Sequence, residues 1–551
     1  MKKIIGFLAI IILMSGCGES FLDTENLTKK DSQSFPKKPG DAEQVLTSVY
    51  RQLIEPDDPK GSVFMLSEIM SDERFGAGGL DDRFIRALAT FRKIGENDYG
   101  TLWSNYYSGI YRVNFLISSL DNVNWDSEEQ RNRIEGEAYF MRAYFYFDLA
   151  RIYGTVPLVT EPTPQNNPKA SAEELFAQIG TDLKIAIEKL PTTPYTVAWG
   201  NANLGHATKW AAEGIMARAF LFYTGYYKQT TMGDITKEQV IGWVDDCVGH
   251  SGHTLLPDFR SLWPYSYSQE YPYAKDNSLH YVGEDGANTE AVFVHRHFGW
   301  NYLGRNLEVL FFGFRYQDNY ADCFPFGQGW GGGTVNPNTF AAWNVNDIRR
   351  KGSILDVRDA SEDVNYQVGK ESQMEDTYLF AKKYIPINVK REDGSILAYI
   401  KDMRPEYAFP GLDYQSENMQ DYISLRFADI LLMGAELGSS QAQNYLDRVR
   451  SRAGLPSVPV TLDNIKSERR WELAFEGLRY FDLLRWHDEN KITENQTNVD
   501  VLNIGKEAKL NVRFRPETGG FLPILLNQIE LSGGILVQNP GWEGADAIFS
   551  E

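Results

Sequence analysis

Apolar residues recur at helical spacing through the first 230 residues of the chain and again after residue 420. In the first such segment Val45, Leu46, Val49 and Leu53 are three or four positions apart, and Asp41 precedes them as a helix-capping residue. The same spacing predicts further helices at 102–120, 129–153, 173–190, 207–223, 422–437, 441–453 and 463–486. We therefore expect a mainly helical protein.

Small residues share one face of several predicted helices. Ala207, Ala211, Gly214 and Ala217 lie on one side of their helix, and the 129–153 segment combines alanines with Tyr and Phe. Small residues against aromatic rings are typical of stacked helix pairs of the tetratricopeptide type, although no clean repeat of about 34 residues can be aligned. The sequence predicts tetratricopeptide-like pairs as the scaffold.

The pattern changes between residues 231 and 419. Gly, Pro, Asn and aromatic residues are frequent there, and short strand-like runs at 290–294 and 396–400 replace the long helical periods. Loops held on a rigid scaffold are where binding residues concentrate. We expect an irregular, loop-rich half that carries the binding site.

Composition narrows the function classes. The chain has 551 residues, is 42% hydrophobic and carries a formal net charge of −20. This hydrophobic content excludes disorder throughout, and an acidic chain lacks the basic footprint that neutralises nucleic-acid phosphates. Nucleic acid is not an expected partner.

The N-terminus resembles that of a bacterial lipoprotein. Two lysines precede an apolar run from Ile4 to Met14, which is shorter than the roughly 18–20 residues of a membrane span and is typical of a secretory signal. The run ends in Ser15-Gly16-Cys17, which resembles a lipobox and makes Cys17 the predicted site of lipid attachment. The alternative is a free cysteine after an ordinary signal peptide.

Metal and redox sites have little support in the sequence. Cys247 and Cys323, the remaining cysteines, could form one disulfide or remain two buried thiols. The His250/His253 and His295/His297 pairs have ligand-like spacing, but no third ligand lies in a recognisable motif. We expect no metal and no cofactor.

Catalytic motifs are also missing from the sequence. The glycine clusters at 76–79 and 327–333 lack the Lys-Ser/Thr of a phosphate-binding loop and are better interpreted as close turns, and there is no Gly-x-Ser-x-Gly elbow. A carboxylate pair for glycoside hydrolysis stays open, because 75 acidic residues offer many pairs. No catalytic residue is assigned.

The segment from 465 to 486 is dense in charge. On one continuous helix Arg469 would pair with Glu472, Glu476 with Arg479 and Asp482 with Arg485, since each pair is three residues apart. This pattern favours a structural network over an active site.

Aromatic residues of the loop-rich half are the candidate ligand contacts. An exposed ring can stack on the apolar face of a sugar while nearby polar groups bind hydroxyls. The alternative is that each ring is a local core residue that pins a loop; we expect at least two of the six to face solvent. The six are Trp300, Tyr302, Tyr316, Tyr320, Phe324 and Trp330.

Several motifs of the sequence resemble those of a known protein family. The last charged segment resembles the signature of RagB/SusD nutrient-binding lipoproteins, and further matches lie at 21–23, 103–114, 137–143, 153–158, 426–429 and 538–542. The signature residues here are Glu468, Arg469, Glu472, Leu473, Phe475, Glu476, Gly477, Arg479, Asp482, Leu483, Arg485 and Trp486.

The resemblance implies an outer-membrane, lipid-anchored protein of Bacteroidetes type, exposed at the cell surface. It implies capture of a glycan and its delivery to a SusC-like TonB-dependent transporter, without catalysis. The regions that correspond to the family's ligand-binding loops are 72–99 and 300–330. Within the first region, Asp72 and Arg74 either bind sugar hydroxyls or stabilise their turn. A peptide-binding protein of the same build and a secreted glycoside hydrolase remain as alternatives.

The expected organisation follows from these assignments. Residues 1–16 are a signal peptide, 17–40 a lipid anchor and tether, and 41–551 a single SusD-like domain. Within that domain we expect a helical scaffold at about 41–230 and 420–490, the loop-rich binding half at about 231–419, and a C-terminal segment at 491–551.

Overall fold

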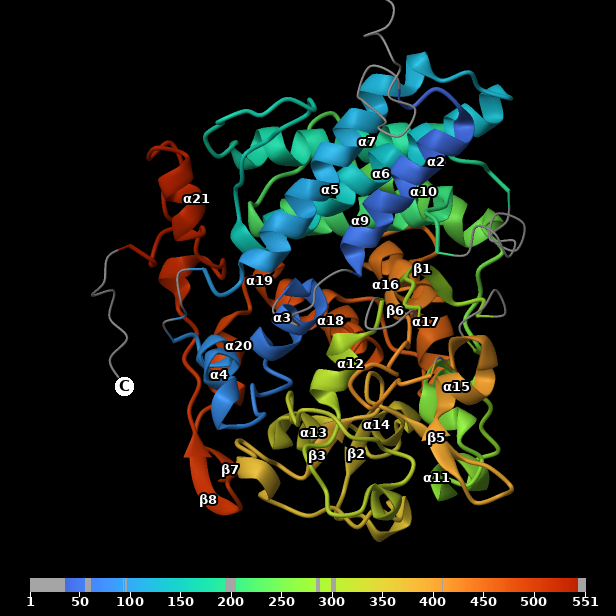
Figure 1. Ribbon diagram of the computed structural model, residues 1–551, viewed down its shortest axis with the longest axis vertical. Helices are drawn as coiled ribbons and strands as arrows, with labels where there is room; N and C mark the ends of the chain where they lie inside the picture. Colours follow the sequence, from blue (N-terminus) through green and yellow to red (C-terminus); the bar gives the residue numbers. More distant parts are fainter. Residues whose placement is uncertain are drawn as a thin grey trace, which may run out of the picture.

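A stack of antiparallel helices forms the upper half of the computed structural model (Figure 1), which describes residues 35–54, 61–92, 94, 97–193, 205–283, 288–298, 304–408 and 410–543. Each helix of the stack packs against the next. The last of them, α10 Lys237–His250, packs against α16 Phe427–Leu437. The stack consists of α2 Pro39–Tyr50, α5 Gly100–Ser119, α6 Glu128–Tyr153, α7 Ala172–Lys189, α9 Lys209–Tyr226 and α10 Lys237–His250. The predicted mainly helical fold with tetratricopeptide-like pairs is confirmed.

Small residues allow close helix contact, as the sequence predicts. Helix α6 begins at Ser127, whose hydroxyl accepts a hydrogen bond from the Gln130 amide, and ends at Gly154 with φ of 73°. A side chain at Gly109 of α5 would place its Cβ 2.5 Å from the Phe145 ring of α6. Glycine at this position therefore lets the two helices approach.

The lower half in Figure 1 is built from short helices, loops and small antiparallel sheets. Among the described residues each sheet has two strands: β1 Ala291–His295 with β6 Tyr422–Arg426, β2 Ile354–Asp356 with β3 Leu379–Ala381, β4 Asn388–Lys390 with β5 Ile396–Ala398, and β7 Val499–Asn503 with β8 Lys506–Leu510. Its helices and those that join the halves are α3 Val63–Met70, α4 Arg83–Ala89, α11 Pro272–Asp276, α12 Leu307–Phe312, α13 Pro337–Ala342, α14 Ile348–Ser353, α15 Tyr399–Met403, α17 Ala442–Arg452, α18 Leu462–Glu472, α19 Arg479–Arg485, α20 Asn490–Asn495 and α21 Leu526–Leu531.

Two predicted helices differ from the structure. The segment predicted as 422–437 begins with strand β6 and becomes helical only at Phe427. The segment predicted as 463–486 is two helices, α18 and α19, because Phe475 and Gly477 adopt φ of 63° and 78° between them. Helix α10 also lies in the region expected to be irregular.

One hydrophobic core joins both halves. It extends from Ala42 in α2 to Leu525 before α21 and includes rings of the lower half such as Phe314 and Tyr384. Cys247 and Cys323 are both buried and free, so the described structure has two thiols where the sequence left a disulfide open. Among the described residues no helix is both long enough and apolar enough to cross a membrane.

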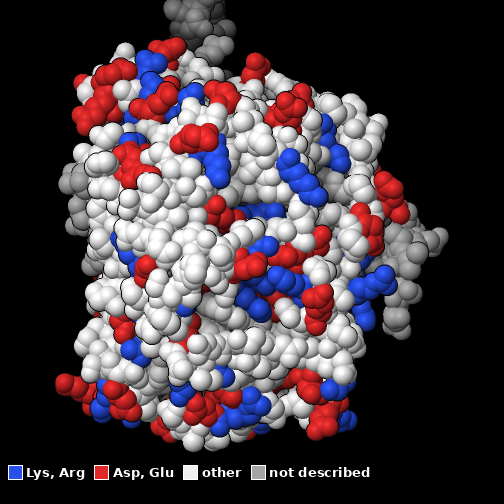
Figure 2. All heavy atoms as spheres, turned by 180° about the vertical axis from the view of Figure 1, so that it is seen from behind, with Lys and Arg blue, Asp and Glu red and all other residues white. Residues whose placement is uncertain are grey.

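The charges are distributed without a single dominant sign on the face opposite to Figure 1. Figure 2 shows basic and acidic side chains intermingled on this face, with a cluster of both near its middle. The net negative charge is therefore not gathered into one acidic surface there.

Candidate functional site

The two glycine clusters of the sequence lie side by side and form the base of the candidate site. The Gly78 amide donates to the Gly331 carbonyl at 2.9 Å, and the Gly333 amide donates to the Gly76 carbonyl at 3.1 Å. A Cβ at Gly329 would collide with the Leu310 carbonyl, which shows why a side chain is excluded there. The prediction of close turns is confirmed, and the turns bring residues 76–79 against 327–333.

Arg315 joins three segments above this base. Its guanidinium donates to the carbonyl oxygens of Trp330 at 3.0 Å and Glu371 at 2.8 Å, and it forms an ion pair with Asp81 at 3.2 Å. Five donors in a planar fork allow one arginine to hold several acceptors at fixed angles. Arg315 therefore fixes the backbone immediately before Tyr316.

Gln317 fixes the backbone on the other side of Tyr316. Its side-chain amide donates to the carbonyls of Arg315, Tyr316 and Gln367, and its Oε1 accepts from the Gln367 amide at 2.7 Å. Gln317 is buried, whereas the Tyr316 side chain between these two anchors is 41% exposed. The structure thus presents one tyrosine on a backbone held from both sides.

Tyr320 and Trp330 flank the same loop but are half-buried. The Tyr320 hydroxyl accepts from the Gln317 amide at 3.0 Å, and burial raises the pKa of this hydroxyl, with Tyr414 adding to the rise. Trp330 packs against the core and donates its amide to the Leu310 carbonyl at 3.0 Å. We call Tyr316, Tyr320 and Trp330 the aromatic platform.

The remaining predicted aromatics divide into two cases. Phe324 packs partly buried against the core, as the alternative interpretation expects. Trp300 and Tyr302 lie outside the described residues. Of the described predicted rings, Tyr316 alone is exposed.

The residues on either side of 299–303 contact each other and the backbone of Gln415. The Phe298 amide donates to the Gly304 carbonyl at 3.0 Å, and the Phe298 side chain is 40% exposed. Arg305 donates to the Gln415 carbonyl at 3.2 Å, next to Tyr414, which influences Tyr320. Arg305 therefore ties the residues after 303 to segment 414–415.

Asp72 and Arg74 do not belong to a ligand surface, and the prediction that they bind sugar hydroxyls is wrong for both. Asp72 is fully buried and binds Arg479 through both carboxylate oxygens at 2.8 and 3.0 Å. Burial alone would raise the pKa of Asp72, but Arg479 and Arg470 hold it well below its ordinary value. Arg74 pairs with Glu68 at 2.7 Å and stacks on the Phe312 ring. Both residues stabilise the turn, which is the alternative that the sequence left open.

The charged signature segment forms a buried network, but with different partners from those expected. Only Asp482 and Arg485 pair as predicted, at 2.8 Å. The break between α18 and α19 leaves Glu476 outside the helix that carries Arg479, and Arg469, although on the same helix as Glu472, binds Asp429 and Asp482 instead. The remaining signature carboxylates bind cations of other elements: Glu472 binds Arg349, Arg426 and Arg452, and Glu476 binds Lys383 and Arg426. Glu476 and its two cations are all at least 98% buried.

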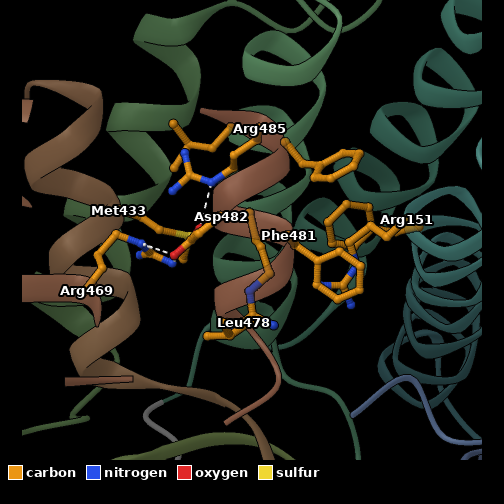
Figure 3. Close-up of a pocket in the computed structure, with 11 residues that line it drawn as sticks. Arg151, Met433, Arg469, Leu478, Phe481, Asp482 and Arg485 are labelled. Atoms are coloured by element: carbon orange, nitrogen blue, oxygen red, sulfur yellow. Dashed lines mark hydrogen bonds and ion pairs between the residues drawn. The ribbon is translucent and has the colours of Figure 1, made fainter. Parts of the chain in front are cut away.

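A small enclosed cavity lies beside this network, between α9, α16 and α19 (Figure 3). Asp482 there accepts from both Arg469 and Arg485, while the Arg151 guanidinium lies 4.2 Å from the centre of the Phe481 ring. The cavity has a volume of about 20 Å³, which suffices for about one water molecule. A sugar ring does not fit in this cavity.

Of the paired histidines, His295 is buried in the fold, whereas His250 is exposed on α10. The buried His295 side chain contacts the Tyr144 hydroxyl at 2.9 Å, and burial lowers its pKa to about 3. His250 contacts Asp246 of its own helix at 2.7 Å. Within the described part of the chain, no group of three or more His, Cys, Asp or Glu residues is arranged to hold a metal ion.

Sequence reasoning did not identify the residues that hold the platform. Arg315, Gln317 and Asp81 act through contacts with residues far away in the chain, and no local periodicity signals them. The arginine directly before an aromatic residue in a glycine-rich region is the only available signal.

Comparisons with known proteins agree with this architecture. A family model described as "Starch-binding associating with outer membrane" matches residues 20–221, and one described as "SusD family" matches residues 312–542. SusD-like protein P2 of Formosa agariphila is 24% identical over 95% of this chain and 100% of its own length.

Solved structures share the fold. Surface glycan-binding protein A from Bacteroides fluxus has a TM-score of 0.71 at 23% identity, covering 92% of this chain and 100% of its own. A laminarin binding SusD-like protein has a TM-score of 0.68 at 25% identity, with the same coverage. Since the two family models together match the greater part of the sequence, the chain belongs to the SusD/RagB family.

Proposed function

We propose that this protein is a surface-exposed, lipid-anchored glycan-binding protein that captures oligosaccharide or polysaccharide for a SusC-like TonB-dependent transporter. The observation that carries glycan binding is the exposed Tyr316 ring on a backbone held by Arg315 and Gln317. A ring that is already fixed loses little conformational freedom when a sugar stacks on it. Family membership and the relatives' glycan-binding names support the same class of ligand.

The proposed site comprises the aromatic platform together with Trp300 and Tyr302. Tyr316 provides the stacking surface, and the half-buried Tyr320 and Trp330 lie on segments bound to its neighbours Gln317 and Arg315. Such a site covers the apolar face of a sugar and leaves most hydroxyls to water, so we expect weak affinity.

Location and partner are part of the proposal. Residues 1–16 would direct export, Cys17 would carry the lipid, and residues 17–40 would tether a single domain, 41–551, at the outer-membrane surface. The absence of nucleic-acid partners is expected from the net charge of −20. Transporter and lipid anchor follow from the family resemblance.

We further propose that the protein is not an enzyme. The signature carboxylates that could suggest acid–base chemistry are bound to buried Arg and Lys side chains. The two alternatives, a secreted glycoside hydrolase and a peptide-binding protein of the same build, differ from the proposal in what they do to polysaccharide.

The test uses the purified full chain carrying Cys17→Ala, a glycan array and native gels that contain the polysaccharides found on it. Retarded migration without release of reducing sugar supports the proposal. Steady release of sugar ends favours the hydrolase. Binding of peptides with no retention of any glycan favours the peptide-binding protein.

A further inference from the structure

A second concave surface lies apart from the aromatic platform, beside β4, β5 and α15. It has a volume of about 520 Å³, within the range of roughly 300–1,000 Å³ that is common for small-ligand sites. Tyr267, Tyr281, Val389, Arg391 and Asp402 line it, and none of them is a contact described above for the platform. In Figure 1 the neighbouring elements α11 and β5 lie at the lower right.

Two tyrosines form its aromatic walls. Tyr267 and Tyr281 are both half-buried, and both rings contact the ring of the buried Tyr399, with centroid distances of 6.2 and 5.9 Å. Because one buried ring supports both, their orientations are fixed relative to each other. They lie within the span of a short oligosaccharide.

Asp402 fixes the polar side of the surface. Its carboxylate accepts from the Tyr267 hydroxyl at 3.0 Å and from Arg391 Nε at 2.9 Å. Val389 of β4 is buried at the floor. The surface therefore combines an apolar floor, two held rings and an ion pair at the rim, which suits a ligand with both apolar faces and hydroxyls.

Its charge indicates a neutral ligand. The cationic Lys390 and Arg391 lie beside the anionic Glu270, Glu392 and Asp402, so neither sign dominates. An anionic ligand such as a phosphate would meet the three carboxylates, whereas sugar hydroxyls can bind to either kind of group.

We propose that this groove, which we call the Tyr267 groove, is a second carbohydrate-binding site that takes a neutral oligosaccharide across Tyr267 and Tyr281. It does not depend on the aromatic platform. Two sites on one molecule would hold a long polysaccharide more tightly than a short one, because the second contact becomes intramolecular.

The test is hydroxyl-radical footprinting of the purified full chain carrying Cys17→Ala. The probes are five neutral hexasaccharides with gluco-, manno- or xylo-configured units: laminari-, cello-, malto-, manno- and xylohexaose. We expect at least one of them to protect Tyr267 and Tyr281 from oxidation, and this protection to persist in a Tyr316→Ala variant. Failure of all five to protect these tyrosines would overturn the proposal, as would loss of the protection in Tyr316→Ala.

Matched variants separate stacking from structure. Tyr267→Ala together with Tyr281→Ala should weaken binding at this groove about tenfold or more, whereas Tyr267→Phe keeps the ring and should change it less than threefold. Tyr111→Ala removes an exposed tyrosine of α5 and serves as the control. If the double alanine variant does not fold, footprinting of the parent chain alone decides. Protection of Tyr316 without protection of Tyr267 and Tyr281 supports the platform and overturns the groove. Protection of Tyr267 and Tyr281 without protection of Tyr316 supports the groove and counts against the platform.

Discussion

The Arg315 guanidinium donates a hydrogen bond to the carbonyl oxygen of Trp330 at 3.0 Å. Through this contact, and through those with Glu371 and Asp81, one side chain holds the backbone on which Tyr316 is displayed. The most exposed ring of the aromatic platform is therefore presented by a fixed support.

Arg315→Lys should weaken glycan binding. Lysine keeps the charge but cannot reach several acceptors with a planar fork, so the Tyr316 backbone loses part of its support. We expect affinity to fall about threefold to tenfold, equivalent to about 0.7–1.4 kcal/mol, which is close to the loss of one hydrogen bond worth about 1 kcal/mol. Calorimetric titration with a glycan identified on the array measures this. The exposed Arg513, changed to Lys, is the control; equal affinity of the Arg315→Lys and parent proteins would contradict the positioning role.

Tyr316→Ala should reduce glycan affinity about tenfold or more, equivalent to about 1.4 kcal/mol, without altering the melting curve. The ring is 41% exposed, so its removal takes little apolar area out of the core. Tyr316→Phe keeps the stacking face and should bind nearly as well. The outcome that counts against the platform is normal binding by Tyr316→Ala and by the corresponding Trp300 and Tyr302 variants.

Glu476→Ala should destabilise the fold without changing affinity per folded molecule. The substitution leaves Lys383 and Arg426 buried without their shared carboxylate, and breaking a buried pair costs about 3–5 kcal/mol. Urea unfolding measures the loss. Glu517→Ala, which removes a half-exposed partner of Arg515, should cost less than about 1 kcal/mol. Unchanged stability of Glu476→Ala together with lost binding would place this segment at the ligand.

The buried Glu213 of α9 should make the free energy of unfolding fall as pH rises. Burial raises its pKa from 4.5 to about 9, so between these values the folded chain holds a proton that the unfolded chain has released. Stability from this group is therefore full below the unfolded pKa and decreases upward through this window. Glu213→Gln removes the titration and should gain stability over the parent between about pH 5 and about pH 8, by at most about 1.4 kcal/mol per pH unit. A difference between the two proteins that is independent of pH would contradict this assignment.

Cys17→Ala should move the protein from the membrane fraction to the soluble fraction. The lipid would be attached to this thiol, and the described residues contain no helix that could span a membrane. Fractionation of cells after a salt wash, in a strain without the transporter, tests the anchor alone. Retention of the variant in the membrane fraction would show that another feature holds the protein there.

The long helices could be predicted because their contacts repeat every few residues. Helix α5 lies within two residues of its predicted bounds, and the small residue Gly109 meets an aromatic ring as the pattern indicates. The break between α18 and α19 could not be predicted, because Glu472 and Glu476 turn toward Arg349, Lys383 and Arg426. These partners are supplied by distant parts of the chain.

The composition of the loop-rich half indicates the region of the candidate site, but it does not distinguish exposed residues from buried ones. Tyr316 and Tyr320 have the same side chain and similar neighbours in the sequence, yet one is exposed and the other is held against the core by the Gln317 amide. Asp72 and Arg74 also differ from what their sequence position suggests. Both are polar residues in a predicted ligand loop, yet both are buried in ion pairs, with Arg479 and Glu68 respectively. Only tertiary contacts distinguish these cases.

The pairing of the two glycine clusters separates support from selectivity. Contacts between the backbones of 76–79 and 327–333 do not depend on which side chains the adjoining loops carry. Substitutions at 316–320 can therefore alter the groups of the proposed site while the backbone pairing of the glycine clusters stays the same. A chimaera that receives a relative's residues only at 316–320 should therefore retain the parental fold while acquiring the donor's ligand preference.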